Sequence, residues 1–494
     1  MIDSSFNPRF ADLKPYPAMK DSGVPWLGDL PSSWETRRNG RLFSQRNQMG
    51  YPALPILEVS LKTGVRVRDF GSSNRKQVMS DREKYKLVRK GDIAYNMMRM
   101  WQGAVGVAPI DGLVSPAYVV ARPYNDVNAR YYDILFCTDL YKNEVNKFSR
   151  GIVSDRNRLY WEDFKQISSP YPPLSEQLAI VRFLDHVDRR IRKYISAKQK
   201  LIKLLEEQKQ AIIHQAVTGQ IDVRTGKPYP AYKPSGVEWL GEVPEHWEIV
   251  RLGRLVVLLT GFPFKSDGFT QIEEDTRVLR GVNISPGAIR WSDVVRWPLA
   301  DCGDYEEYKL RAGDIILGMD RPIIRGGTRV AVIEDADLPS LLCQRVARFR
   351  QKEMIRTELI TMILSGKAFK DYLTPIFTGI SVPHLSPEQI KSFRFALPGL
   401  VEQNKIVDYV TTRTIKTHAL AQVAENKINL LREYRTRLIA DVVTGKLDVR
   451  EAAARLPEEI DEPEPLDEPD AEGGAEGLGE NDDDEATEEA EDEL

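Results

Sequence analysis

Cationic, amide and aromatic side chains gather beside glycines in three loop-like segments of each half of this chain. The segments are 62–68, 99–102 and 150–160 in the first half, and 262–266, 321–329 and 378–384 in the second. An Arg side chain donates two hydrogen bonds to guanine O6 and N7, and an Asn or Gln side chain pairs with adenine N6 and N7. Lys and further Arg side chains bind phosphates. These segments therefore suit recognition by hydrogen bonding and charge, without covalent chemistry.

The sequence contains no catalytic or metal-binding constellation. None of its Gly-Lys pairs has the upstream Gly and following Ser or Thr of a phosphate-binding loop. Asn7-Pro-Arg-Phe10 is the nearest match to the Asn-Pro-Pro-aromatic tetrapeptide of amino-methyltransferases, and it fails at its third position. No GxSxG or HExxH segment is present, and the cysteines lack zinc spacing. We therefore expect a non-catalytic chain that binds no cofactor and no metal, with buried free thiols at Cys137, Cys302 and Cys343.

A long sequence repeat provides the frame that must position these segments. Residues 16–43 are largely written again at 229–256, at a constant offset of 213. A period near two hundred residues far exceeds the roughly 20–50 residues of solenoid and propeller repeats, so a whole domain is duplicated. The repeated tryptophans are expected to pack the frame, because they recur while the loops diverge: Trp26, Trp34, Trp239 and Trp247. Trp101, in a loop, is the better candidate for stacking on a base.

Each half ends in a long helical pattern. Residues 175–218 contain no Gly or Pro and place apolar side chains at 3,4 spacing, and a second such run ends near Val442. A 44-residue helix spans about 65 Å, which is too long for the core of one small domain. Gly219 and Gly445 follow the two patterns and predict left-handed caps. We expect an antiparallel pair whose seams are Leu184, Val187, Ile191, Tyr194, Lys198, Leu201, Leu205 and Ile212 in the first helix, and Leu420, Val423, Leu431, Tyr434, Leu438 and Val442 in the second.

The predicted fold class is α/β (α+β), with two similar globular domains joined by two long antiparallel coiled-coil helices in a pseudo-twofold internal repeat. Strand-rich stretches support this class, and both halves contain a Gly-Asp-Ile triplet in one of them, at 91–93 and 313–315. The expected boundaries are 1–172 for the first domain, 173–218 for the central helix, 219–398 for the second domain, 399–446 for the distal helix and 447–494 for a tail.

Charge is divided unevenly between the body and the tail. Residues 451–494 contain 21 acidic residues and one basic residue, whereas residues 1–450 contain 68 basic and 52 acidic residues. A basic body suits a polyanionic partner. The tail has too few large apolar side chains to fold alone and is expected to be disordered; it either competes with nucleic acid for the basic face or only aids solubility. The sequence has no apolar signal region and no spanning segment, so we expect a cytoplasmic protein without membrane contact.

These features together resemble the specificity subunit of type I restriction–modification systems. The resemblance rests on Asp21-Ser-Gly-Val-Pro-Trp-Leu-Gly28 and its copy Pro234-Ser-Gly-Val-Glu-Trp-Leu-Gly241, on the Gly-Asp-Ile triplets and on the Leu-x-Glu-Gln helix starts. The order of module, long helix, module and long helix is also typical of that family. The resemblance covers nearly everything before residue 451 and does not explain the acidic tail.

The resemblance implies a DNA-binding subunit of a phage-defence complex. Its two target-recognition domains would each read one half of a bipartite site in double-stranded DNA, and the helices would set the gap between the halves. Two methyltransferase subunits would dock on the repeated regions, and two restriction (motor–nuclease) subunits would join them. Those partners would hold S-adenosylmethionine, ATP and Mg²⁺, which this chain would not bind.

The residues expected to contact DNA lie in the six loop-like segments. They are Lys62, Arg66, Arg68, Arg99, Trp101, Gln102, Arg150, Ser154, Arg156, Asn157 and Arg158 in the first half, and Lys265, Arg321, Arg325, Arg329, Ser381 and His384 in the second. The resemblance places the segment before each long helix near DNA. For each residue the alternative is a surface charge or a structural turn.

Two interpretations from other classes remain open. The chain could itself methylate or cut DNA, although the missing motifs argue against this. It could also be a scaffold that binds proteins and no DNA.

Overall fold

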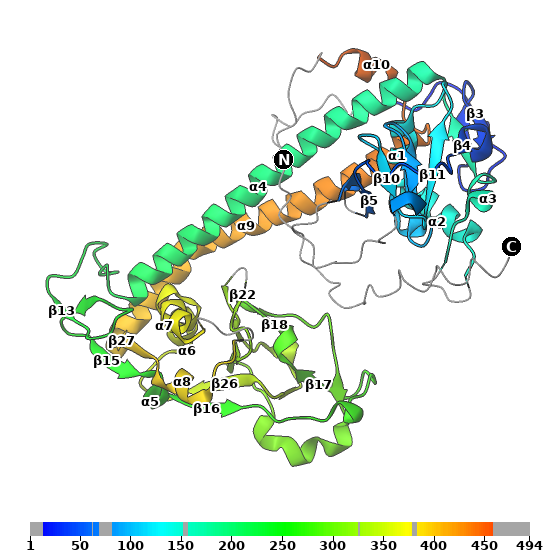
Figure 1. The fold of residues 1–494 in the computed structure, drawn as a ribbon. Coiled ribbons are helices and arrows are strands. Elements are labelled where there is room, and N and C mark those ends of the chain that lie inside the picture. Colours follow the sequence, from blue (N-terminus) through cyan, green and yellow to red (C-terminus); the bar gives the residue numbers. More distant parts are fainter. Residues whose placement is uncertain are drawn as a thin grey trace. The chain divides into compact units, whose positions relative to one another are not determined.

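The chain divides into two units, each of which mixes strands with helices (Figure 1). Unit 1 contains residues 1–198 and 426–494, and unit 2 contains residues 199–425. The computed structural model describes residues 13–61, 63–68, 82–151, 157–324, 327–377 and 383–457. Predictions that fall outside these residues concern Lys62, Ser154, Arg156, Arg325, Ser381 and the tail from residue 458. Among the described helices, none is long and apolar enough to cross a membrane.

Unit 1 is built around a four-stranded antiparallel sheet. Its strand order is β4-β11-β8-β9, formed by β4 (Phe43–Gln45), β11 (Tyr118–Pro123), β8 (Ile93–Asn96) and β9 (Val105–Val107). A hairpin of β5 (Leu57–Ser60) and β6 (Gly64–Val67) lies beside β9. Helices α1 (Ala129–Phe136) and α2 (Asp139–Phe148) share one aromatic-rich core with the sheet. β3 (Glu35–Arg38) pairs with β12 (Ser168–Tyr171), which leads into the first long helix.

Unit 2 repeats this topology, which confirms the duplication predicted from the sequence. Its main sheet has the order β16-β26-β21-β24, formed by β16 (Val256–Thr260), β26 (Val346–Gln351), β21 (Ile315–Gly318) and β24 (Val330–Val332). Helices α6 (Thr357–Ser365) and α7 (Lys367–Phe377) complete its core, and β15 (Glu248–Arg251) pairs with β27 (Arg394–Leu397).

Unit 2 also has a second sheet, of order β20-β17-β25. It comprises β20 (Arg296–Trp297), β17 (Thr276–Leu279) and β25 (Ser340–Leu342). Beside it a small core contains the rings of Phe262, Phe264, Trp297 and Tyr305 and the thiols of Cys302 and Cys343. All three cysteines are free, but Cys137 is exposed, so the expected burial is wrong there.

Two long helices, α4 (Leu174–Val217) and α9 (Leu400–Val443), run through both units and are 44 residues each. In unit 1 the start of α4 packs against the end of α9, where Arg435 pairs with Asp188. In unit 2 Ile213 and Val217 of α4 share a core with Ile406 and Val410 of α9. The predicted antiparallel pairing is therefore confirmed.

The predicted caps after both helices are also confirmed. Gly219 and Gly445 have φ values of 72° and 77°. A Cβ on Gly219 would lie 2.5 Å from Pro244, and one on Gly445 would lie 2.4 Å from Pro31. Only glycine fits both the left-handed backbone and this close approach.

The predicted seams of both helices are partly wrong. Leu201 of α4 is exposed and Leu420 and Val423 of α9 are more than half exposed, whereas Leu431, Leu438 and Val442 are buried as expected. The buried stripe recurs every seven residues at Val410, Thr417, Ala424, Leu431 and Leu438. Because Thr417 and Ala424 are small and only weakly apolar, the spacing of the large apolar residues points to the neighbouring exposed face.

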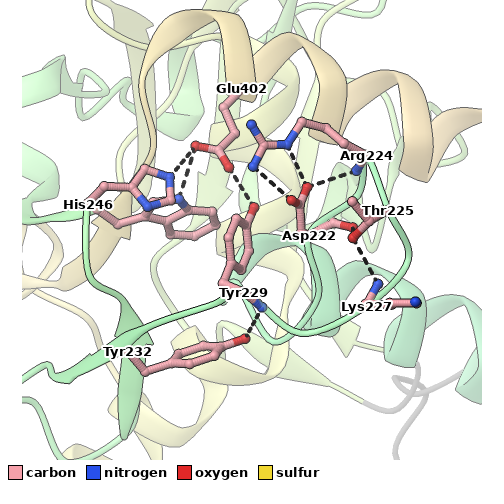
Figure 2. Close-up of polar contacts among 9 residues, drawn as sticks. Asp222, Arg224, Thr225, Lys227, Tyr229, Tyr232, His246 and Glu402 are labelled. Carbon is pink, nitrogen blue, oxygen red and sulfur yellow. Dashed lines mark hydrogen bonds and ion pairs between the residues drawn. The ribbon is translucent and has the colours of Figure 1, made fainter.

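The Glu-Gln pair at the start of each long helix anchors the repeated opening segment of its unit. In unit 2 Glu402 accepts a hydrogen bond from Tyr229 Oη at 2.6 Å and from Trp247 Nε1 at 3.2 Å, and His246 Nε2 lies 2.9 Å away (Figure 2). The neighbouring Gln403 bonds the backbone of Met354, Arg356 and Pro398. Tyr229, Trp247 and Glu402 thus fix the segment to the helix.

Unit 1 builds the equivalent junction from both ends of the described chain. Tyr16 donates to Glu176, and Arg450 stacks over the Tyr16 ring and lies 3.8 Å from Glu176. The backbones of Lys14 and Asp448 form a β-bridge, as those of Lys227 and Asp222 do in unit 2. All four repeated tryptophans are frame residues: Trp34 and Trp247 are fully buried, and the indoles of Trp26 and Trp239 donate to backbone carbonyls. The prediction that they pack the frame is confirmed.

The expected start of the tail at residue 447 is wrong. Residues 447–457 belong to the fold of unit 1, and Arg450–Ala454 forms the short helix α10. Val449 and Ala453 are buried in the core of unit 1. The repeated segment after each long helix is part of the frame, so the fold continues past the end of α9.

Candidate nucleic-acid interface

In unit 2 four segments distant in sequence meet at one place, where Met319 N donates to Arg345 O at 2.9 Å. Phe262 bonds the backbone of Leu342 and Gln344, which brings the segment after β16 beside the segment before β26. Leu385 N donates to Met319 O at 2.9 Å, and Arg321 N donates to Pro383 O at 2.8 Å. The segment after β21 therefore lies against the segment that precedes the short helix α8 (Pro387–Ser392).

Asp320 is the centre of a charged cluster at this meeting point, and we call Asp320, Arg345 and His384 the Asp320 cluster. Arg345 Nη1 donates to Asp320 Oδ2 at 2.8 Å, and His384 Nδ1 lies 2.6 Å from Asp320 Oδ1. Partial burial disfavours the Asp320 carboxylate, but hydrogen bonds from Arg345 and His384 outweigh it, so the pKa of Asp320 lies below its usual range. Arg345 remains 63% exposed. The cluster therefore holds a guanidinium and an imidazole in place at the surface.

Two residues of this region have a backbone conformation that side-chain-bearing residues rarely adopt. Arg321 has a φ of 43° and Arg345 has a φ of 62°, and they are the non-glycine residues with positive φ in the described part of the chain. Such a conformation costs roughly 1–3 kcal/mol and recurs at binding and catalytic sites. Both arginines thus occupy backbone positions where a glycine would be less strained.

Arg329 has a positioning role within this region. Its guanidinium donates to the carbonyls of Ile284 and Asp320, both at 3.1 Å. Burial lowers the pKa of Arg329, and Arg321 lowers it further, against the influence of Asp320. Because two of its donors bond backbone carbonyls, Arg329 fixes the loop that carries Asp320. Lys265, in the segment after β16, is exposed at the start of a short 3-10 turn.

Unit 1 assembles its loops in the same way. Leu159 N donates to Met97 O at 2.9 Å, which matches the bond from Leu385 to Met319 in unit 2. Arg150 and Arg158 exchange backbone hydrogen bonds at 2.9 Å, and Arg150 Nη2 donates to Asp163 Oδ1 at 2.5 Å. The Arg150 side chain remains largely exposed, and Asn157 donates to Asn146 at 2.9 Å. The structure brings Arg150, Asn157 and Arg158 together beside residues 97–102.

The other described residues predicted to contact DNA in unit 1 have different settings. Arg66, on the β5–β6 hairpin, pairs with Glu58 at 2.7 Å. Trp101 packs against the core and donates to Met98 O at 3.0 Å, so its indole has a structural role and the ring is only partly exposed. Gln102 is exposed, and Arg68 and Arg99 are partly buried. No group of metal-ligating side chains occurs among the described residues.

Sequence reasoning missed Asp320 and Arg345. Asp320 directly precedes Arg321, which was predicted to contact DNA. An acidic side chain is not itself expected to bind a polyanion, so residue type gives no reason to choose Asp320. Arg345 directly precedes the apolar start of β26, and its role depends on a positive φ that residue type does not reveal. The available signal was the segment Cys343-Gln-Arg345, where an amide and a cation precede an apolar strand.

Comparisons with known proteins show which family this chain resembles. Residues 22–204 match the family model described as the type I restriction modification DNA specificity domain. The chain is 26% identical over 485 residues to the type I restriction enzyme EcoAI specificity subunit of Escherichia coli, which covers 80% of this chain and 79% of that protein. It is 28% identical over 288 residues to the MjaVIII specificity subunit of Methanocaldococcus jannaschii, which covers 58% of this chain and 64% of that protein.

A solved structure shares the fold. A chain from a study of complex assembly and conformational transition of the type I R-M system superposes with a TM-score of 0.60 at 16% identity. The alignment covers 85% of this chain and 99% of the other. At this identity the likeness concerns the fold alone.

Proposed function

Since the chain belongs to the specificity subunits of type I restriction–modification systems, we propose that each of its units reads one half of a bipartite target in double-stranded DNA. Unit 1 does so through the loops that carry Arg150, Asn157 and Arg158, and unit 2 through the Asp320 cluster and Arg321. The domain ranges 1–172 and 219–398 are then the two target-recognition domains.

One observation carries this proposal: equivalent loops meet in both units, but with different side chains. The backbone bonds from Leu159 to Met97 and from Leu385 to Met319 are the same contact in the two copies. Arg150 with Asp163 occupies this place in unit 1, and the Asp320 cluster occupies it in unit 2. A common frame with divergent polar loops suits two readers of different half-sites.

The long helices serve as the spacer and as the docking surface for methyltransferase subunits. A helix of 44 residues is about 65 Å long, and a paired helix keeps a distance that a flexible linker does not. Within unit 2 both helices expose large apolar side chains that are available to a protein partner. These side chains are Leu201 and Leu204 on α4, and Ile415, Leu420 and Val423 on α9.

The catalytic work belongs to the partners. Two methyltransferase subunits supply S-adenosylmethionine, and two restriction subunits supply ATP and Mg²⁺ and complete a cytoplasmic complex. The chain contributes recognition and geometry. Its own side chains supply phosphate contacts, base contacts and a fixed gap, and none of these forms or breaks a covalent bond.

Binding of DNA by the chain with its methyltransferase subunit tests the proposal. We expect a gel shift on duplex DNA at low salt, with an association constant that falls by about 10³–10⁵ between 50 and 200 mM salt if about 6–10 phosphates are contacted. Tighter binding to a target duplex than to a random duplex at the higher salt would indicate base recognition. A complex that assembles but never shifts DNA at any salt would instead favour a protein scaffold.

A further inference from the structure

A cationic stripe runs along one face of α4 within unit 1. The stripe begins at Arg182 and continues 4, 7, 8 and 11 residues later, at His186, Arg189, Arg190 and Lys193. This spacing places all five side chains on one side of a helix. The four Arg and Lys residues are exposed. Partial burial lowers the pKa of His186, and Arg190, Arg189 and Arg182 lower it further, which indicates that these three cations surround the imidazole.

The acidic residues of this stretch of α4 pair with arginines outside the stripe. Asp185 accepts from Arg130 at 3.1 Å. Asp188 accepts from Arg192 at 2.7 Å and also from Arg435 of α9. The side chains of Asp185 and Asp188 are therefore engaged by Arg130, Arg192 and Arg435.

The described chain ends against this stripe. Arg182 Nη2 donates to Leu456 O at 2.8 Å and to Pro457 O at 3.3 Å. Residues 458–494 follow at once and contain 20 acidic residues and neither Lys nor Arg. Eleven helical residues span about 17 Å, and five or six extended residues span the same distance. An extended segment 458–462, which contains four acidic residues, would thus be long enough to reach from Arg182 to Lys193.

We propose that the acidic segment from residue 458 binds the cationic stripe of α4 in the same molecule. The first acidic residues pair with Arg189, Arg190 and Lys193, while Arg182 holds the backbone at 456–457. The bound segment screens this face of unit 1 from other polyanions. This contact is independent of the proposed reading of DNA by the loops, because none of the stripe residues belongs to those loops.

Zero-length carbodiimide cross-linking of the full chain tests the contact, with the Lys193 amine as reporter. At 50 mM salt we expect cross-links from Lys193 to carboxylates in residues 458–470. Their yield should fall at least about tenfold at 1 M salt, because the Debye length shrinks from more than 10 Å to about 3 Å. The yield should not change on dilution, since the contact lies within one molecule.

Charge removal on the stripe provides the second arm. The double variant R189A/R190A leaves Arg182 in place and should lower the Lys193 cross-link at least about fivefold, if the two arginines hold the segment. K405A/R413A, which removes two exposed cations from α9 in unit 2, should leave the cross-link unchanged. The proposal fails if wild-type Lys193 cross-links no more to residues 458–470 than other exposed lysines do. It also fails if the cross-link survives R189A/R190A or if its yield falls on dilution.

Discussion

Alanine in place of Asp92 is expected to lower the free energy of unfolding of unit 1 by about 3–5 kcal/mol. Asp92 is the acid of the first Gly-Asp-Ile triplet, and only 4% of its side chain is exposed. It accepts two hydrogen bonds from Arg46, at 2.6 and 3.2 Å, and one from Arg89 N at 2.9 Å. Its removal leaves the Arg46 guanidinium, which is only 14% exposed, without its carboxylate partner. An uncompensated buried charge is the reason for the large cost.

The second Gly-Asp-Ile triplet gives an internal comparison. Asp314 accepts two hydrogen bonds from Arg350, at 2.6 and 2.9 Å, and one from Arg311 N at 2.9 Å. Arg350 is 30% exposed and can recruit water when the acid is lost. Asp314→Ala should therefore cost unit 2 less than Asp92→Ala costs unit 1.

Hydrogen exchange resolved by mass spectrometry measures both effects in the full chain. Protection should fall in β8 and β11 for Asp92→Ala and in β21 and β26 for Asp314→Ala. Asp92→Ala combined with Arg46→Met should recover much of the lost stability, because the stranded charge is gone. If the double variant is no more stable than Asp92→Ala alone, the cost does not come from an unpaired Arg46.

Alanine in place of Arg345 is expected to weaken binding to one half of the DNA target by about 1–3 kcal/mol, roughly 5- to 150-fold. Arg345 is exposed, is held by Asp320 at 2.8 Å and occupies a strained backbone position. A preset guanidinium loses little freedom when it bonds a guanine edge, so its removal takes away both the contact and the preorganisation. Alanine at a φ of 62° also remains strained, and the loop should keep its place through Arg329.

Arg356→Ala is the matched control for Arg345→Ala. Arg356 is also an exposed arginine of unit 2 paired with a carboxylate, Glu358, but it stands at the N-cap position of α6 and belongs to none of the loop segments predicted to contact DNA. Its loss should lower affinity for all duplexes slightly and equally, if at all. Competition binding with duplexes altered in one half-site at a time distinguishes the two. If both variants lose the same affinity for every duplex, Arg345 does not contact a base.

The frame of this protein could be predicted from the sequence because the segments that form it occur twice in the chain. The four tryptophans, the caps at Gly219 and Gly445 and the two long helices recur at fixed offsets, and their structural roles follow from that recurrence. The Glu-Gln pairs were visible as a repeat, but their roles were not, since Glu402 meets Tyr229 and Trp247 only after the chain has folded.

The site was less predictable because the two copies differ there. Arg321 and His384 could be proposed from their residue types, whereas Asp320 and Arg345 matter through contacts across 25 and 64 positions of the chain. The prediction of the α9 seam was partly wrong for a related reason. Helical spacing alone offered two faces, and the buried one uses Thr417 and Ala424 in place of large apolar residues.

The central claim is that each unit reads its own half of one bipartite target. Methylation mapping on a library with both half-sites randomised tests it directly, using the complete complex with wild-type, Arg150→Ala or Arg345→Ala chains. We predict that Arg150→Ala relaxes one half of the methylated site, that Arg345→Ala relaxes the other, and that the gap between the halves stays the same. Relaxation of the same half by both variants, or of both halves by either one, would contradict the account.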